Sequence, residues 1–410
     1  AMTVDVIYSY SKLKFRGTIM KKLAVAIGAI VAGGMTAAQA DVTVFGHLDQ
    51  SLNYIENGDW SGTSNKAAGL ASGGRNASSD ATRNASPYIA WGDEDTRFVC
   101  TTCSVGFKGS EDLGNGLKAI FKLDFQFDMN NRNSNGSITD RDQWLGLAGN
   151  FGSVKVGTIS TPYKSTGAKL DPGYRTVAQM RDVGIQSALH SGAGSFGQGR
   201  AENTVRYDSP SWNGLKLSAS YTLVPDNKGG TNNDNGYGAG ISYENGGILV
   251  FANYLNNGTD DDAEAYKAGA KWTFNNFAVF GQYEVDGGLI TDRYNGSLGD
   301  DSEGDGADVW MLGGSWAFGN NLIYAAYGQG EGTDATASDL GLTNDVNNDG
   351  SVDKDDANPF IGDDHASYQV IGVHNLSKRT LAYAGYVKVD FDQKKVNDID
   401  HFTIGMKHKF

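Results

Sequence analysis

Hydrophobic and polar residues alternate along most of the chain. Between Leu117 and Phe127 every odd position is apolar, and every even position except Ile120 is polar. A period of two residues places the two kinds of side chain on opposite faces of an extended strand. The same alternation recurs in 215–223 and 266–274 and in the C-terminal segment. We therefore predict an all-β protein whose strands have one apolar and one polar face.

Sixteen strands are predicted on this basis. They cover 41–56, 98–109, 116–130, 140–149, 153–159, 202–209, 214–224, 236–244, 248–256, 263–274, 277–285, 308–318, 322–330, 366–376, 380–390 and 399–410. The links between them alternate between short turns and long polar loops, a pattern typical of a transmembrane antiparallel β-barrel of the outer membrane. The alternative, a large soluble propeller or pair of sandwiches, does not require loop lengths to alternate.

The N-terminal segment has the features of a secretory signal peptide over residues 20–40. Lys21 and Lys22 precede an apolar core over 23–31, and Ala38-Gln39-Ala40 provides a small-residue cleavage site. The apolar run is shorter than an anchor helix needs, which disfavours that alternative. We expect residues 1–19 to be an upstream extension or an artificial tail, and 41–410 to form a single barrel domain.

Composition narrows the function classes. The chain of 410 residues has a formal net charge of −14, and removal of residues 1–40, with five basic residues and one acidic residue, leaves −18. Such acidity argues against nucleic-acid binding, which needs a basic surface. The 56 glycines and 6 prolines fit a protein of turns and strands, and a barrel of this length is one domain.

Several segments resemble Gram-negative general porins. They are Asp41–Gly46, Gly106–Ala119, Trp144–Gly152, Asn203–Pro210 and the C-terminal residues Thr403, Gly405, His408 and Phe410. The resemblance implies a sixteen-stranded barrel in the Gram-negative outer membrane, assembled as a homotrimer among lipid and lipopolysaccharide. It also implies that the C-terminal residues are an assembly signal that the barrel-assembly machinery reads.

The resemblance further implies that the third long loop, about 160–201, folds into the lumen and narrows it. In that family, acids of the loop face a cluster of arginines on the wall. Arg141 and Arg206 stand where two such arginines are expected, whereas Ser104 stands where a third is expected. The loop itself contributes Asp171, Arg175 and Arg181 as candidates.

Strand parity predicts which charged residues face the lumen. The basic candidates outnumber the acidic ones, and they are Lys118, Lys122, Arg141, Lys155, Arg206, Lys216, Lys267, Lys271, Lys388, Lys407 and Lys409 against Asp49, Asp124, Glu284 and Asp390. A basic wall concentrates anions, so a weak preference for anions is expected. The alternative is that many of these lysines extend toward the rim and have no selective role.

A twelve-residue segment in the seventh long loop, 345–356, matches a calcium-binding loop. Oxygen ligands are expected from Asp345, Asn347, Asp349, Ser351, Asp353 and Asp356. Gly350 falls at the sixth position, where the loop must turn sharply, but the last position is Asp where Glu is usual. It looks like the loop of dockerin-type repeats. The alternative is an acidic, solvated loop that matches by composition. No other cofactor is expected.

The two cysteines, Cys100 and Cys103, have the spacing of a redox motif but lie in a strand-like stretch. Export to an oxidising compartment favours a small structural disulfide, although residues three apart in an extended strand are about 10 Å apart and need a turn to be bridged.

The sequence therefore predicts a porin for passive diffusion of small hydrophilic solutes and ions, and not an enzyme. Two alternatives are a solute-specific outer-membrane channel and a calcium-dependent surface interaction protein anchored by its barrel.

Overall fold

The computed structural model describes most of the predicted barrel domain. The described residues are 41–57, 94–130, 139–190, 193–194, 199–223, 235–258, 263–291, 306–340, 342, 350–354, 359–392 and 398–410. The predicted signal peptide and the segment before it lie outside these ranges. The domain boundaries at 19/20 and 40/41 therefore stay predictions.

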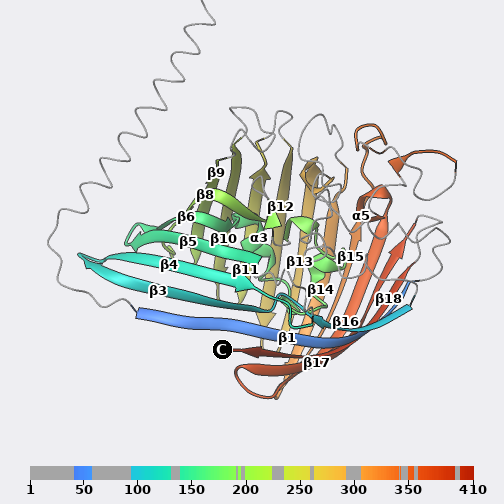
Figure 1. Cartoon of the computed structure of the whole chain (residues 1–410), viewed down its shortest axis with the longest axis horizontal. Helices are drawn as coiled ribbons and strands as arrows, with labels where there is room; N and C mark the ends of the chain where they lie inside the picture. The colour runs from blue at the N-terminus through green and yellow to red at the C-terminus, as the bar shows by residue number, and fades with distance from the viewer. Residues whose placement is uncertain are drawn as a thin grey trace, which may run out of the picture.

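The strands form one antiparallel ladder that closes on itself. Their bounds are β1 Asp41–Asn57, β2 Glu94–Cys100, β3 Ser104–Gly114, β4 Leu117–Gln126, β5 Thr139–Gly149, β6 Gly152–Ser160, β7 Ala193–Gly194, β8 Arg200–Asp208, β9 Leu215–Thr222, β10 Gly236–Asn245, β11 Ile248–Asn256, β12 Glu264–Phe274, β13 Phe277–Gly287, β14 Val309–Phe318, β15 Asn321–Gly330, β16 His365–Asn375, β17 Thr380–Phe391 and β18 Ile399–Lys409. Each barrel strand pairs with its neighbours in the chain, and β1 pairs with both β3 and β18 (Figure 1). The predicted all-β barrel is confirmed.

Eighteen assigned strands correspond to sixteen barrel strands among the described residues. The two-residue β7 pairs in parallel with β8 and lies beside the ladder. Strands β2 and β3 both pair with β1 and continue one another, so the predicted single strand 98–109 is interrupted. The break falls at 101–103, where Thr102 has φ of +49°, a conformation that a β-branched residue rarely adopts.

Exposure alternates along the strands as the sequence pattern predicts. In β18, Phe402, Ile404 and Met406 are all more than half exposed on the outside, whereas His401 is fully buried and Thr403 nearly so. Apolar groups on the outer surface of a barrel are solvated by lipid, so their exposure carries no penalty in a membrane.

Aromatic rings gather at the end of the barrel that carries the short turns. Phe274 and Phe277 flank the turn between β12 and β13 with ring centroids 5.9 Å apart, and Phe277 stacks on Trp316 of β14 at 6.1 Å. Trp272 lies 4.6 Å from Phe274. Such a band is the aromatic girdle expected where a barrel crosses the membrane interface.

The helices are short. They are α3 Pro162–Gly167, the 3₁₀ turns Met180–Asp182 and Ala188–His190, and α5 Pro359–Gly362. Within the described residues, no helix has the length and apolar character needed to cross a membrane.

Candidate pore constriction

The described residues of 161–199, which follow β6 and precede β8, form a segment that we call the constriction segment. It begins as a capped helical turn: Thr161 Oγ1 accepts a hydrogen bond from the Lys164 amide at 3.3 Å, and Pro162 occupies the first helical position. The Thr161 amide also donates to the Gly199 carbonyl at 2.8 Å. The two ends of the segment are therefore hydrogen-bonded to each other where it leaves and rejoins the barrel wall.

The constriction segment has a hydrophobic core of its own against the barrel wall. Its apolar side chains are fully buried, and they are Leu170, Val177, Met180, Val183, Ile185 and Leu189. Most of them share a cluster with inward side chains of the wall, among them Phe280, Tyr324 and Tyr383. Burying one such side chain stabilises a fold by about 1.5–3 kcal/mol, so this segment is held in place mainly by apolar contacts.

Polar anchors fix one side of the segment to β12 and β13. The Glu284 carboxylate accepts hydrogen bonds from the Tyr163 hydroxyl at 2.7 Å, the Ser187 amide at 3.0 Å and the Ser187 hydroxyl at 2.6 Å. Lys267 Nζ donates to the Tyr163 carbonyl at 2.5 Å and lies 2.8 Å from His190 Nε2. These side chains are almost fully buried, so the anchor is shielded from water.

A second set of contacts joins the segment to β1, β4 and β18. Lys407 Nζ donates to the Tyr174 carbonyl at 2.5 Å, and an Arg175 guanidinium nitrogen lies 3.1 Å from His47 Nδ1. The other Arg175 nitrogen lies 3.6 Å from Asp124. The segment therefore touches the inner wall at two separate places, which agrees with an inward-folded third loop.

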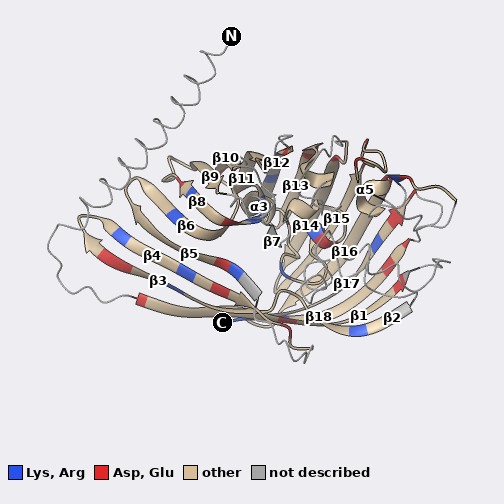
Figure 2. Ribbon diagram, turned by 45° about the horizontal axis from the view of Figure 1, so that its top comes forward, with Lys and Arg blue, Asp and Glu red and all other residues tan. Residues whose placement is uncertain are grey.

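Two carboxylates organise the basic groups beside the segment. Asp124 lies 3.4 Å from both Lys122 and Arg141 and 3.6 Å from Arg175. Asp142 lies 2.9 Å from Lys122 and 3.0 Å from Arg200, and it accepts from the Ser160 amide at 3.0 Å. Basic residues are coloured on β4, β5 and β6 in Figure 2.

Arg206 and Lys155 share the carboxylate of Asp208. The Arg206 guanidinium donates to both oxygens, at 2.7 to 3.1 Å, and Lys155 Nζ donates at 2.7 Å. Arg206 also donates to the Ser165 hydroxyl at 2.8 Å and so contacts α3.

Burial and charge act together on titratable groups of the constriction segment. Burial lowers the pKa of the Lys164 ammonium well below its usual range, and Arg200 and Arg181 lower it further. Burial alone would raise the pKa of the Tyr174 hydroxyl, but the guanidiniums around it, Arg181 first, lower it overall. The lowering of the Tyr174 pKa, against the effect of burial, reflects the positive charge around the segment.

Several residues predicted to line the lumen are instead buried. Asp171 is 6% exposed because its two oxygens accept the Gly173 and Met180 amides, at 2.8 and 3.1 Å, within the segment. Asp49 is fully buried and accepts from the Tyr383 hydroxyl at 3.0 Å. For these two carboxylates the expected lining role is wrong. The docked segment covers Asp49, and hydrogen bonds within the segment occupy both oxygens of Asp171.

Six more of the predicted lining residues are also buried, and they are Asp124, Arg141, Arg181, Lys267, Glu284 and Lys407. Arg181 donates to the His190 carbonyl at 2.8 Å, and its guanidinium lies 5.2 Å from the Tyr174 ring centroid. Such residues shape the field of the passage from beneath its surface. Among the basic candidates, Lys118, Lys216 and Lys409 are exposed. The partly exposed ones are Lys122, Lys155, Arg175, Arg206, Lys271 and Lys388.

Ser104, where the resemblance leads one to expect a third wall arginine, is buried with its hydroxyl 3.4 Å from His47 Nδ1. The same nitrogen contacts Arg175. A guanidinium of the constriction segment thus reaches the region where the wall has none.

Sequence reasoning missed Arg200 and Asp142. The pairing of β4 with β5 shifts register between Leu123 and Phe125, and this irregularity lets both Arg141 and Asp142 reach charged partners of the lumen. Strict alternation assigns only one of two consecutive residues to the lumen, so parity could not find Asp142. Arg200 has the parity of Arg206 and could have been found by extending that strand.

Cys100 and Cys103 form a disulfide across the break between β2 and β3, with Cα atoms 5.9 Å apart. The turn that bridging requires is the one centred on Thr102. Cys103 Sγ also lies 3.4 Å from the Asp49 amide, on the inner side of β1.

The calcium-loop motif is only partly covered: Asp345, Asn347, Asp349 and Asp356 lie outside the described residues. Gly350 has φ of +97°, the conformation that a sharp turn at the sixth position needs, and Ser351 donates to Asp353 at 3.1 Å. The part of the chain that the structure describes contains no group of three or more His, Cys, Asp or Glu side chains placed to hold a metal ion.

The C-terminal residues of the predicted assembly signal lie on β18 and just after it. Phe410 exchanges backbone hydrogen bonds with Gly46, and His408 Nδ1 lies 2.9 Å from the Thr380 hydroxyl. Gly405 leaves room for the Tyr383 ring, which a Cβ would meet.

Solved porin structures share this architecture. An anion-selective porin from Comamonas acidovorans superposes with a TM-score of 0.60 at 20% identity, covering 91% of this chain and all of that one. OmpT of Vibrio cholerae, in a trimer form, superposes with a TM-score of 0.56 at 14% identity, covering 90% of this chain and 99% of that one. At these identities the likeness concerns the fold.

Sequence comparison finds relatives at higher identity than these structures. The major outer membrane protein P.IB of Neisseria meningitidis serogroup B is 30% identical over 231 residues, which is 56% of this chain and 57% of that protein. A P.IB protein of Neisseria gonorrhoeae is 33% identical over 153 residues, 37% of this chain and 39% of that protein. These matches span less than two thirds of the relatives. A family model described as Gram-negative porin matches residues 23–394. The chain therefore belongs to the Gram-negative porin family and is a protein of the Gram-negative outer membrane.

Proposed function

We propose that the protein forms a water-filled channel through which small hydrophilic solutes and ions diffuse passively. The observation that supports this most directly is the constriction segment, anchored across the inside of a closed barrel whose inner face is polar. A structural anchor would gain nothing from a partly occluded, charged lumen, whereas a diffusion channel needs a passage that limits size. The proposal assigns no catalytic step.

We further propose a weak preference for anions. Beside the constriction segment, the basic residues Lys122, Arg141, Arg175, Arg181 and Arg200 outnumber the acidic residues Asp124, Asp142 and Asp182. A passage lined by an excess of one charge concentrates the opposite ion. Because each of these three carboxylates is already paired with a basic group, little negative potential remains to attract cations.

The test is single-channel recording in planar bilayers with a salt gradient. Stepwise conductance increases are expected, and the reversal potential in potassium chloride should have the sign of chloride selectivity. If purified, folded protein inserts but produces no steps, the channel proposal is wrong. A cation-selective reversal potential would contradict the anion preference but would still support the channel proposal.

We propose a homotrimer as the assembled form, supported by the trimeric form of the Vibrio cholerae relative in fold. Detergent-solubilised protein should migrate at three chain masses after cross-linking. A sample that is boiled without cross-linking should migrate at one chain mass. A folded monomer without cross-linked species would contradict it. We likewise propose that the residues Thr403, Gly405, His408 and Phe410 are read by the barrel-assembly machinery and that the outer surface contacts lipid and lipopolysaccharide.

We propose that loop 345–356 binds calcium weakly, which the spacing of its oxygen ligands and the turn at Gly350 support. The final Asp can coordinate with one oxygen where Glu supplies two, so the dissociation constant should be in the range of about 10⁻⁴–10⁻³ M. Calorimetry on the whole protein should detect heat at millimolar calcium that the Asp345→Asn/Asp349→Asn variant lacks. Equal heats from both proteins would contradict the proposal.

A further inference from the structure

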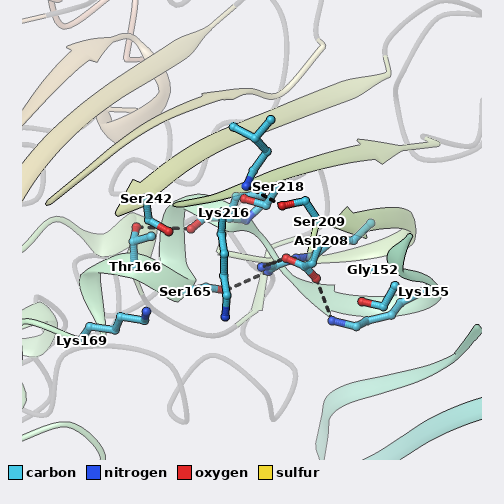
Figure 3. Close-up of a pocket in the computed structure, with 14 residues that line it drawn as sticks. Gly152, Lys155, Ser165, Thr166, Lys169, Asp208, Ser209, Lys216, Ser218 and Ser242 are labelled. Atoms are coloured by element: carbon cyan, nitrogen blue, oxygen red, sulfur yellow. Dashed lines mark hydrogen bonds and ion pairs between the residues drawn. The ribbon is translucent and has the colours of Figure 1, made fainter. Parts of the chain in front are cut away.

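A cavity of about 510 Å³ lies beside α3, between the constriction segment and the wall strands β6, β8, β9 and β10 (Figure 3). Most of the lining side chains come from five elements, α3, β6, β8, β9 and β10. The helix α3 contributes Ser165 and Thr166, and Lys169 follows it. The cavity is large enough for a solute of several times the volume of water, about 30 Å³ per molecule.

Positive charge dominates this cavity. Lys155, Lys169, Arg206 and Lys216 line it, against one carboxylate, Asp208. The structure gives Lys216 no ion pair within the described residues, and Lys169 is paired only with Glu244, in a contact where both side chains are well exposed. Exposed pairs of this kind contribute little, so both ammonium groups can turn to a solute.

The kind of positive group identifies the kind of anion. The planar Arg206 guanidinium, which would suit a carboxylate, is already engaged in a bidentate contact with Asp208. Lys155 of β6 shares the same carboxylate, so the remaining donors are the ammoniums of Lys169, just after α3, and Lys216 on β9. An ammonium contacts a phosphate oxygen as a point charge, and lysine is a common phosphate ligand, so a phosphate suits these two ammoniums.

Hydroxyl groups form the rest of the polar lining. They belong to Ser153, Ser165, Thr166, Ser209, Ser218 and Ser242. A hydroxyl both donates and accepts, so this surface can exchange hydrogen bonds with the hydroxyls of a solute. Pro162 adds a small apolar patch against which the C–H face of a ring can lie.

We propose that this cavity is a subsite for phosphorylated sugars, with the phosphate at Lys169 and Lys216 and the sugar along the serine hydroxyls of β9 and β10. The assignment rests on the proposed channel function, of which it is a refinement. The site is open to the lumen and its lysines are exposed, so binding is weak and screened by salt, as a solute that must leave again requires.

The experiment uses the whole protein in planar bilayers at about 0.1 M potassium chloride, where exposed charges are only partly screened. Glucose 6-phosphate at millimolar concentration should produce brief reductions of the single-channel current, and glucose should produce none. The Lys169→Gln/Lys216→Gln variant should raise the apparent dissociation constant about tenfold, since two exposed charge contacts are lost.

The matched control is Lys118→Gln, which removes one positive charge from β4 outside the cavity lining; it should change the dissociation constant less than twofold. The Ser218→Ala/Ser242→Ala variant should weaken glucose 6-phosphate binding and leave binding of inorganic phosphate unchanged. If inorganic phosphate binds the original protein as tightly as glucose 6-phosphate, the sugar assignment is overturned.

Two further outcomes separate this inference from the function it rests on. Normal conductance without current reductions by glucose 6-phosphate overturns the subsite and leaves the channel. Equal binding by the original protein and the double lysine variant also overturns the subsite. Absence of any conductance from folded, inserted protein rejects the channel itself.

Discussion

Gly46 and Phe410 exchange two backbone hydrogen bonds, each 3.1 Å long, and thereby join the first strand to the last residue of the chain. The Phe410 ring also lies over Gly46, where a Cβ would come within 2.6 Å of its Cζ. The seam of the barrel thus has a space that only glycine leaves free.

Gly46→Ala should weaken the closure of the barrel. The added methyl group meets the Ser104 carbonyl and the Phe410 ring, so β1 must move, at a cost of about 1–3 kcal/mol. The measurement is the midpoint temperature at which the folded barrel converts to unfolded chain in detergent. Gly372→Ala is the matched control, because its nearest neighbour would be 3.8 Å away. Equal midpoints for both variants would contradict the seam argument.

Replacing both Cys100 and Cys103 by serine should lower stability modestly. The disulfide closes a loop of only four residues, so its effect on the unfolded chain amounts to about 2 kcal/mol. Thermal unfolding in detergent should shift by a few degrees, while conductance stays unchanged because Cys103 is fully buried and presents no surface to the passage. Complete loss of the folded barrel would show that the break at Thr102 depends on the bond.

The anchor around His190 should weaken as the pH falls. Burial lowers the pKa of this imidazole well below 6.5, and Lys267 lowers it further, so the folded protein holds it neutral. The unfolded state binds a proton below about pH 6.5 and the folded state does not; stability is therefore present above that pH and is lost as the pH falls. The equilibrium constant for opening of the anchor should therefore rise by up to about tenfold for each pH unit by which the pH falls.

Hydrogen exchange of the backbone at 185–190 measures this opening. Exchange should accelerate between pH 7 and pH 5 beyond the intrinsic pH effect. His190→Gln keeps an oxygen acceptor for Lys267 and cannot titrate, so its corrected exchange should be independent of pH. The same pH response in both proteins would exclude His190 as the cause.

Asp124→Asn should raise anion selectivity. Three basic groups, Lys122, Arg141 and Arg175, lie within 3.6 Å of this carboxylate, and its removal leaves their charge uncompensated. The chloride-to-potassium permeability ratio should rise about two- to fivefold, as read from the reversal potential. Asp112→Asn, near the end of β3 beside the short turn, is the control and should leave the ratio unchanged. An unchanged permeability ratio in the Asp124→Asn variant would show that other residues set the selectivity.

Period-two alternation was enough to predict the barrel and the faces of its strands, because lipid and lumen water select residues at every second position. It failed where the backbone departs from that period: the break at Thr102 and the register shift that brings Asp142 inward. It also could not show that Asp49 and Asp171 are buried. Asp49 is buried against Tyr383 of β17, and Asp171 is buried within a segment that Lys407 of β18 holds in place, and both of these partners are far away in sequence.

The buried core of the constriction segment makes it a mechanical strut as well as a sieve. Leu170, Met180 and Ile185 fill space that the wall strands would otherwise leave empty, and Glu284 and Lys407 hold that filling in place. Trimming the segment to widen the passage would therefore remove support from the wall at β12 and β13 and also at the seam of β1 and β18. In this protein, permeability and rigidity are set by the same side chains, and a more permeable variant should also be a softer one.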